Sequence, residues 1–291
     1  MAELKKILVT GSNGQLGKEL QRICSIVPGY EFIFLSRADM PINQFEMVRH
    51  IFNTLKPDYC INCAAYTAVD KAEEEKDLAF EINGEAVGVL AAVCLEHETK
   101  FVHISTDYVF DGKGTKPYVE SDETSPVNTY GASKLKGEEE VFKYNPDALI
   151  IRTSWVYSEF GKNFVKTMLR LMADKNSISV VNDQVGSPTY AADLAEVIIK
   201  IIQYHKWKPG IYHYSNEGVI TWFDLANAIK EIAGTNTEIN PISTAEFPTP
   251  AKRPAYSVFN KQKIQETFGI TLKDWKSSLN TCIQQIKNAP K

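Results

Sequence analysis

The 291-residue chain lacks the features that mark several classes of protein. It has 32 Lys and Arg residues against 36 Asp and Glu residues, a net charge of −4, and no dense basic block. Neither a nucleic acid nor a membrane is therefore an expected partner. No apolar run approaches the roughly 20 residues of a membrane span. The first residues lead straight into an apolar strand and not into a secretory signal, so we expect a cytoplasmic protein.

Cysteine is scarce and odd in number. Cys60 and Cys63 have the spacing of a redox or metal motif, but they lie within residues 58–65, which read as a buried strand. Residues three apart on a strand point to opposite faces. Buried free thiols are therefore the expected outcome. The five histidines show no metal-ligand spacing either, so no metal site is predicted from them.

A glycine-rich turn follows the first apolar strand. Residues 6–10 are apolar and β-branched, Gly11, Gly14 and Gly17 come next, and residues 18–24 continue with helical spacing. Between a strand and a helix, such glycines permit a tight turn, the approach of backbone N–H groups to a pyrophosphate, and close helix packing. The helix N-terminus also attracts phosphate. We predict a dinucleotide-binding turn; a plain strand-to-helix turn is the alternative.

The end of the second predicted strand, 31–35, bears on the choice of cofactor. An acidic residue at this place favours NAD, but Ser36 and Arg37 stand here and leave room and charge for a 2′-phosphate. Asp39 is expected past the strand end, where its backbone and that of Met40 could pass under the adenine. These residues favour NADPH without excluding NADH. A solvated surface charge is the other interpretation of Arg37.

The remaining pattern predicts an α/β fold with a doubly wound, Rossmann-type parallel sheet. Strands are expected at 59–64, 100–106 and 147–152, with helices at 44–55 and 78–96. Asn83, in the second helix, needs partners if it faces inward. We expect residues 1–157 to form a dinucleotide-binding domain. Residues 158–291 should form mainly a smaller α/β substrate-binding lobe, with some segments returning to the first domain.

Tyr130 and Lys134 stand four residues apart at the start of a predicted helix, and therefore share one face. An ammonium beside a phenol lowers the pKa of the phenol. The pair is a candidate proton donor to a carbonyl oxygen that receives hydride. Thr106, at the carboxyl end of a predicted strand, could hydrogen-bond the same carbonyl. The alternative is an amphipathic helix with a solvated lysine.

Several motifs occur in the order typical of the extended short-chain dehydrogenase/reductase family. They are the glycine turn, residues 62–65, residues 105–110, Ser125-Pro126 and Tyr130-x-x-x-Lys134. From about residue 5 to about residue 285 the chain resembles, within that family, the dTDP-4-dehydrorhamnose reductases. The segments that carry this resemblance are 14–17, 64–73, 152–157, 163–168, 182–189 and 248–254.

The resemblance implies NAD(P)H-dependent reduction of the 4-keto group of dTDP-4-dehydro-L-rhamnose to give dTDP-L-rhamnose. Tyr130 would be the proton donor, and Lys134 would lower its pKa and bond the nicotinamide ribose. Thr106 would orient the substrate with Asp107 beside it, and Trp155 would cover the sugar. The implied cofactor contacts are Ser12, Asn13, Gln15 and Leu16 at the pyrophosphate and Ala64, Ala65 and Tyr66 at the adenosine.

Three points lie outside these roles. Arg253, in the proline-rich segment 244–254, could grip a nucleotide diphosphate bidentately, or belong to a surface linker. Some members of the family are described with a metal held by Glu residues at a dimer contact. Glu19 could match one ligand, but Asp193 occupies a second candidate region, so no metal is predicted; a homodimer could still form.

Two other functions stay open. The chain could be a non-catalytic regulatory module, since the regulatory β subunit of eukaryotic methionine adenosyltransferase is similar to the same family. It could also reduce or epimerise another nucleotide sugar. The joint presence of Tyr130, Lys134 and Thr106 favours catalysis.

Overall fold

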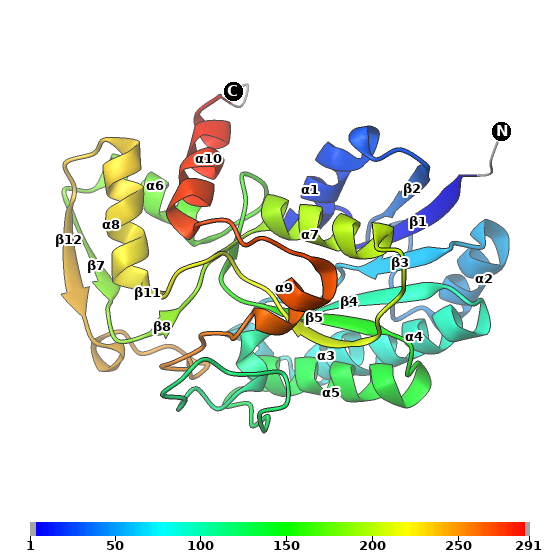
Figure 1. Cartoon of the computed structure of the whole chain (residues 1–291). Helices are drawn as coiled ribbons and strands as arrows, with labels where there is room; N and C mark the ends of the chain where they lie inside the picture. The colour runs from blue at the N-terminus through cyan, green and yellow to red at the C-terminus, as the bar shows by residue number, and fades with distance from the viewer. Residues whose placement is uncertain (1–3, 289–291) are drawn as a thin grey trace.

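The computed structural model describes residues 4–288 and contains a six-stranded sheet with the order β10-β5-β4-β3-β1-β2 (Figure 1). Every neighbouring pair in it is parallel. The strands are β1 (Lys5–Thr10), β2 (Tyr30–Leu35), β3 (Tyr59–Asn62), β4 (Lys100–Thr106), β5 (Leu149–Thr153) and β10 (Gly210–His213). The strand order reverses at β1, because β2 lies on one side of it and β3 on the other. The predicted doubly wound sheet is confirmed, and its ligand crevice is expected beyond the carboxyl ends of β1 and β3.

Helices cover both faces of this sheet (Figure 1). One layer contains α1 (Gln15–Ile23), α7 (Ala191–Gln203) and α9 (Gln262–Phe268); the other contains α2 (Phe45–Leu55), α4 (Ala86–Glu96) and α5 (Thr129–Tyr144). Alternate strand residues serve the two layers: Ile7 belongs to the first core and Leu8 to the second. Cys60 and Cys63 likewise pack in different cores, and both are free thiols, as predicted.

A second group of elements has a core of its own. Its helices are α6 (Phe164–Asp174), α8 (Trp222–Ala233) and α10 (Trp275–Asn288). Its strand pairs are β6 (Val156–Tyr157) with β9 (Thr189–Tyr190), β7 (Ser177–Val181) with β12 (Glu238–Ile242), and β8 (Val185–Gly186) with β11 (Ile220–Thr221). Strand β10 and helix α7 come late in the chain, yet β10 belongs to the six-stranded sheet and α7 packs in the same helix layer as α1. Short 3₁₀ turns are η1 (Cys24–Ile26), η2 (Lys71–Glu73), η4 (Asp107–Val109) and η5 (Thr244–Glu246).

The helix predicted over residues 78–96 is interrupted by a π turn. Helix α3 (Lys76–Phe80) runs into η3 (Glu81–Glu85) and then into α4. Asn83 in this turn is buried; its side chain binds the Tyr66 backbone and the Ser133 hydroxyl. A Cβ at Gly137 of α5 would lie 2.1 Å from the Asn83 carbonyl oxygen. The π turn therefore fits a very close approach of α5.

Residues Lys76–Glu96 together form a helical stretch long and apolar enough, by length and composition alone, to cross a membrane. The sequence interpretation had found no such stretch. More than half of its apolar window is buried inside the protein, and α4 packs against α2 and α5. This burial is that of a core helix.

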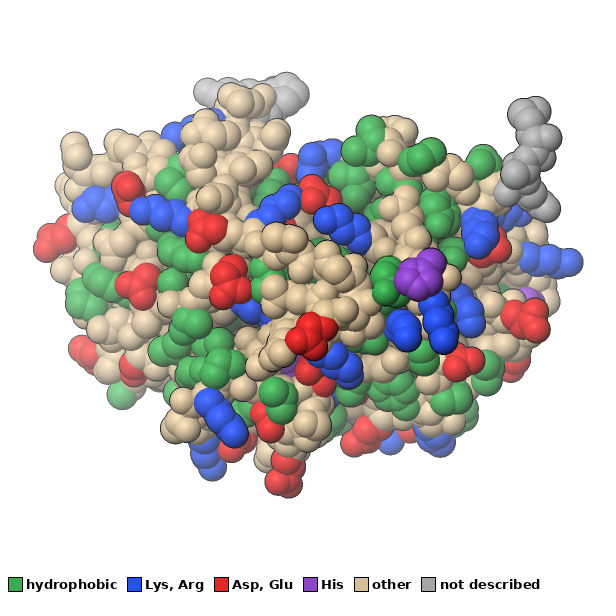
Figure 2. Space-filling model, in the orientation of Figure 1, with side chains coloured by type: hydrophobic (Ala, Val, Ile, Leu, Met, Phe, Trp, Pro, Cys, Tyr) green, Lys and Arg blue, Asp and Glu red, His purple; other side chains and the backbone are tan. Residues whose placement is uncertain are grey.

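The face shown in Figure 2 carries basic and acidic side chains mixed together.

Helix α5 is anchored to the sheet by a buried ion pair. The Arg152 guanidinium on β5 donates to the Glu138 carboxylate at 2.6 Å and 2.9 Å, and both side chains are 3% exposed. The Ser105 hydroxyl on β4 donates to the same carboxylate. These contacts join α5, β4 and β5 beneath the carboxyl edge of the sheet.

We predict that Arg152→Met destabilises the protein by about 3–5 kcal/mol, because it leaves the Glu138 carboxylate buried without its countercharge. The double variant Glu138→Gln/Arg152→Met removes both charges and should lose clearly less. Urea unfolding followed by circular dichroism measures the two losses. A single variant no less stable than the double one would show that the pair does not anchor α5.

Candidate active site

The carboxyl edge of the sheet collects predicted site residues from five strands. The glycine turn follows β1, Ser36 follows β2 and Ala64 lies beyond β3. Thr106 ends β4, where it stands opposite Thr153, the last residue of β5. Trp155 comes two residues later. The structure thus brings the glycine turn, the carboxyl end of β4 and the start of α5 to one end of the sheet (Figure 1).

The glycine turn has the shape of a phosphate cradle. Gly11 has φ +61°, and a Cβ there would lie 2.6 Å from the Ala64 nitrogen. A Cβ at Gly17 would lie 2.6 Å from Ser12 Cα, so α1 sits directly on the turn. The N-cap of α1 is Gly14, which has no side chain to occupy the first-turn N–H groups. The side chain of Leu16 is buried in the core, so this residue offers only its backbone to a ligand.

Asp39 lies past the end of β2, as expected. Its carboxylate turns back to the strand end, where it accepts from the Ser36 N–H at 2.8 Å and the Ser36 hydroxyl at 2.6 Å. These hydrogen bonds hold the pKa of Asp39 below its usual value. Arg37 is exposed, and Met40 is 2% exposed with its side chain in the core. The strand end therefore carries both a carboxylate and a guanidinium.

Two buried side-chain amides hold the backbone of the segment that follows β3. The Ala64 N–H donates to Asn62 Oδ1 at 3.2 Å, and the Tyr66 N–H donates to Asn83 Oδ1 at 2.8 Å. The Tyr66 hydroxyl turns outward to Glu75. The sequence had marked Asn83 without giving it a role and had included Asn62 only as the first residue of the 62–65 motif. An Asn at a strand end before small residues is the signal that could have found it.

Tyr130 lies in the first turn of α5, which the side chain of Asn128 caps by accepting from the Gly131 N–H at 2.8 Å. Its ring meets Tyr108 edge-on at 5.7 Å. Burial raises the pKa of Tyr130 to about 12, while the hydroxyl of Thr106 acts in the opposite direction. The pKa of Tyr130 is therefore raised, whereas the nearby Lys134 had led us to expect a lowered pKa.

The side chain of Lys134 points into the interior. Its amine donates to the Ile104 carbonyl at 2.7 Å and lies 3.3 Å from His103 Nε2. Burial lowers the pKa of Lys134 to about 8, and the charge of Glu138 partly offsets this effect. The sequence had excluded His103 from a metal site and had suggested no contact between it and Lys134.

Asp107 directly follows Thr106 and is also buried. Its Oδ1 accepts from the Thr106 hydroxyl at 3.1 Å, whereas Oδ2 has no hydrogen-bond partner among the residues that the structure describes. Burial raises the pKa of Asp107 to about 6, against the hydroxyls of Ser257 and Thr106. An unpaired buried oxygen of this kind is an acceptor for a ligand hydroxyl.

Trp155 adopts a left-handed backbone, with φ +49°. Its indole stacks on Trp222 with ring centroids 3.7 Å apart and planes 11° apart. A Cβ at Gly186 would meet the indole at 2.6 Å, so Gly186 is needed to seat it. Trp222 was not predicted, because nothing local connects two tryptophans so far apart in the chain.

Arg253 is not a free cation. Its two terminal nitrogens donate to the two carboxylate oxygens of Asp70 at 2.8 Å and 2.9 Å, and one also donates to the Ala251 carbonyl. Tyr108 also lies near enough to act on the pKa of Arg253, although burial and the Asp70 carboxylate act on it more strongly. The guanidinium therefore lies close to the site, but it is held by the carboxylate of Asp70, which lies between β3 and η2.

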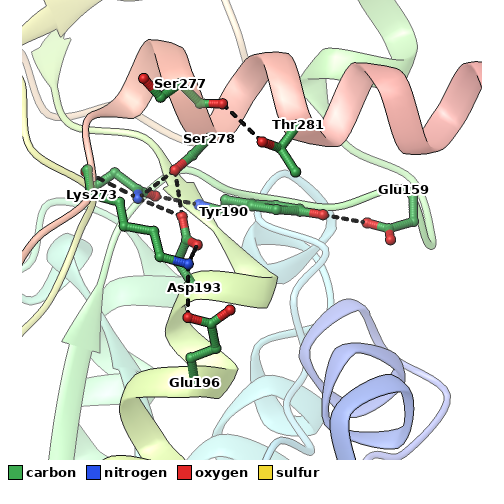
Figure 3. Close-up of polar contacts among 9 residues, drawn as sticks. Glu159, Tyr190, Asp193, Glu196, Lys273, Ser277, Ser278 and Thr281 are labelled. Atoms are coloured by element: carbon green, nitrogen blue, oxygen red, sulfur yellow. Dashed lines mark hydrogen bonds and ion pairs between the residues drawn. The ribbon is translucent and has the colours of Figure 1, made fainter.

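A separate cavity of about 440 Å³ lies between α1, α7 and α10. Figure 3 shows that its acidic groups already have partners: Lys273 bridges Asp193 and Glu196 at 2.8 Å and 2.7 Å, and Tyr190 donates to Glu159. Glu19 nearby accepts from Arg22 and Ser158. Within residues 4–288 no group of three His, Cys, Asp or Glu side chains is arranged to hold a metal ion.

Comparison with known proteins gives matches along nearly the whole chain. The family profile described as RmlD substrate binding domain matches residues 5–288. The spore coat polysaccharide biosynthesis protein SpsK of Bacillus subtilis is 45% identical over 98% of this chain and 99% of its own. The dTDP-4-dehydrorhamnose reductase of Aggregatibacter actinomycetemcomitans is 41% identical over 95% of this chain and 97% of its own.

A solved structure is similarly close. The dTDP-4-dehydrorhamnose reductase of Bacillus anthracis, crystallised in complex with NADP, is 39% identical to this chain. It superposes with a TM-score of 0.94 over 97% of this chain and 100% of its own. By these matches the chain belongs to the RmlD family, the family of the dTDP-4-dehydrorhamnose reductases.

Proposed function

We propose that this protein reduces the 4-keto group of dTDP-4-dehydro-L-rhamnose to give dTDP-L-rhamnose, with NADPH as the donor and NADH as a second donor. The observation that carries the proposal is the meeting of Tyr130, Thr106 and the glycine turn at one sheet edge, in a chain of this family. Residues 1–157 would bind the cofactor and residues 158–291 mainly the sugar nucleotide. The protein would work in the cytoplasm and could form a homodimer.

The glycine turn fits a dinucleotide. A Cβ at Gly11 or Gly17 would collide with the backbone of Ala64 or Ser12, so these glycines let the turn and α1 pack closely. The first turn of α1, which no side chain caps, presents N–H groups and a partial positive charge to a pyrophosphate. The pyrophosphate would lie against Ser12, Asn13 and Gln15. The adenosine side would lie against the backbone of 64–66, which buried amides hold in place.

When bound, the reduced nicotinamide supplies the hydride that the reaction needs. The residues of the chain supply the rest. Tyr130 gives its phenolic proton to the carbonyl oxygen as negative charge builds there, and Thr106 holds that oxygen with its hydroxyl. General acid catalysis of this type contributes roughly 10²–10⁴-fold, and much of the remainder comes from fixing two reactants together.

The surrounding side chains would select the sugar. The unpaired Oδ2 of Asp107 would accept a sugar hydroxyl, and the indole of Trp155, braced by Trp222, would cover the ring. A non-catalytic regulatory module would have no use for a tyrosine hydroxyl within reach of Thr106. This arrangement favours the enzyme over the module.

We predict that Tyr130→Phe keeps NADPH binding and loses at least about 10²-fold in turnover, because the proton donor is gone. Binding is followed by fluorescence of the reduced nicotinamide, and turnover by its absorbance with the 4-keto sugar nucleotide. The matched control is Tyr108→Phe, which alters the neighbouring ring and should remain active. Full activity of Tyr130→Phe would remove Tyr130 from the mechanism.

Arg37→Ala should lower kcat/KM for NADPH by about 10- to 10²-fold and leave that for NADH nearly unchanged. The reason is that a charge-assisted hydrogen bond to the 2′-phosphate is worth about 1.5–3 kcal/mol. Asp39→Asn is the opposed control, since removal of the carboxylate should favour NADPH. Equal losses with both cofactors in Arg37→Ala would mean that Arg37 does not contact the phosphate.

The pKa of Asp107 gives a stability prediction with a defined sign. Because this pKa is raised from 3.8 to about 6, the buried carboxyl favours the folded state below pH 4, and the benefit is lost as the pH rises through 6. Asp107→Asn cannot ionise. The difference between the Tm of Asp107→Asn and the Tm of the natural protein should therefore be more favourable to the variant at pH 8 than at pH 4. Differential scanning calorimetry measures both Tm values. A Tm difference that is independent of pH would contradict this.

A further inference from the structure

A line of buried polar side chains crosses the sheet beneath the candidate site. The Thr10 hydroxyl on β1 donates to Asn62 Oδ1 on β3 at 2.6 Å. Asn62 Nδ2 lies 3.0 Å from His103 Nδ1 on β4, and His103 Nε2 lies 3.3 Å from the amine of Lys134 on α5. All four residues are at most 2% exposed. This line ends on the lysine that the proposed reaction uses.

The orientation of the Asn62 amide follows from a backbone donor. Its Oδ1 accepts from the Ala64 N–H, which cannot act as an acceptor, so the NH₂ group must face the histidine ring. His103 Nδ1 is then an acceptor. A neutral imidazole carries one proton, which must therefore reside on Nε2 and point at the amine of Lys134.

This N–H determines what Lys134 can be. A protonated amine has only donors and would oppose the Nε2–H at 3.3 Å, whereas a neutral amine can accept from it and still donate to the Ile104 carbonyl at 2.7 Å. We propose that His103 is a positioning residue for Lys134: its Nε2–H directs the amine onto the Ile104 carbonyl and disfavours the protonated amine.

The other charged groups around this contact are accounted for. On α5, Glu138 favours a charged Lys134, but this carboxylate is already paired with Arg152 of β5. Burial is the main cause that holds the pKa of the His103 ring well below its usual range, and any charge on Lys134 acts in the same direction. The ring is therefore neutral whether or not Lys134 is protonated. From β3 and from the π turn, the facing side chains are the uncharged Asn62 and Asn83.

The consequence for the reaction rests on the proposed function. After Tyr130 has given its proton to the substrate, it needs another. A lysine that releases its proton near neutral pH can restore it, the ammonium becoming an amine and the phenolate a phenol. The transfer is downhill, because the pKa of Lys134 is about 8 and that of Tyr130 is about 12. By lowering the pKa of Lys134, His103 increases the driving force of this transfer.

The first test needs no variant. Two-dimensional ¹H–¹⁵N spectra of the ¹⁵N-histidine-labelled full chain at pH 7 identify which ring nitrogen of His103 carries the proton. The proposal requires protonation at Nε2 alone. Protonation at Nδ1, or at both nitrogens, would overturn it, and this outcome does not depend on whether any variant folds.

The second test measures Lys134 directly. Titration of ¹³Cε-lysine-labelled protein, with the Lys134 signal assigned by its loss in Lys134→Arg, gives the midpoint of this residue. In His103→Gln, whose amide can turn an oxygen toward the amine, the midpoint should rise by about one pH unit. The matched control is Phe101→Leu, a buried ring beside His103 with centroids 6.2 Å apart, which should leave the midpoint unchanged.

An unchanged midpoint in His103→Gln, or an equal rise in Phe101→Leu, would overturn the proposal. Both measurements are made without substrate or cofactor. A protein without reductase activity but with the expected spectra would contradict the proposed function alone, whereas an active reductase with Nδ1 protonated would contradict only the role of His103.

Discussion

The burial of charge beneath helix α5 is the constraint on which the site depends. Lys134 and Glu138 are one turn apart and both face the sheet, where a polar or charged group without a partner would be very costly. The Ile104 carbonyl accepts from the first, and Arg152 pairs with the second. Because these partners lie on β4 and β5, they fix the height and rotation of α5. The position of the Tyr130 hydroxyl relative to Thr106 follows from that seating and not from any surface contact.

The π turn adds a second constraint that joins the two halves of the site. One amide, that of Asn83, holds the Tyr66 backbone on the proposed adenosine side and also binds Ser133 of α5. Because Gly137 has no Cβ, α5 can lie directly against the backbone carbonyl of Asn83. A regular helix could not present both groups in this way. A displacement of this turn would therefore disturb the cofactor side and the proton donor together.

Local signals made much of this predictable from the sequence. The glycine turn, the strand over 100–106 and the capping of α8 by Thr221, with Gly234 at φ +74°, are each determined by neighbouring residues. The contacts that were missed join residues distant in the chain, as between Trp155 and Trp222. The direction of the Tyr130 pKa was wrong for the same reason, because burial is a property of the whole fold.

The pairing of Arg253 with Asp70 changes how a nucleotide could be recognised. A guanidinium has five N–H donors. Asp70 takes two of those on Arg253 and the Ala251 carbonyl takes a third, so two remain. Those two, on Nε and one terminal nitrogen, lie along one edge of the fork and can still meet a phosphate. Asp70 would then act as the brace that orients this edge, since an Arg held by a carboxylate loses less rotational freedom on binding a ligand. Arg253 can thus bind a diphosphate while it is paired with Asp70. The pairing restricts the directions from which a phosphate can approach its remaining N–H donors.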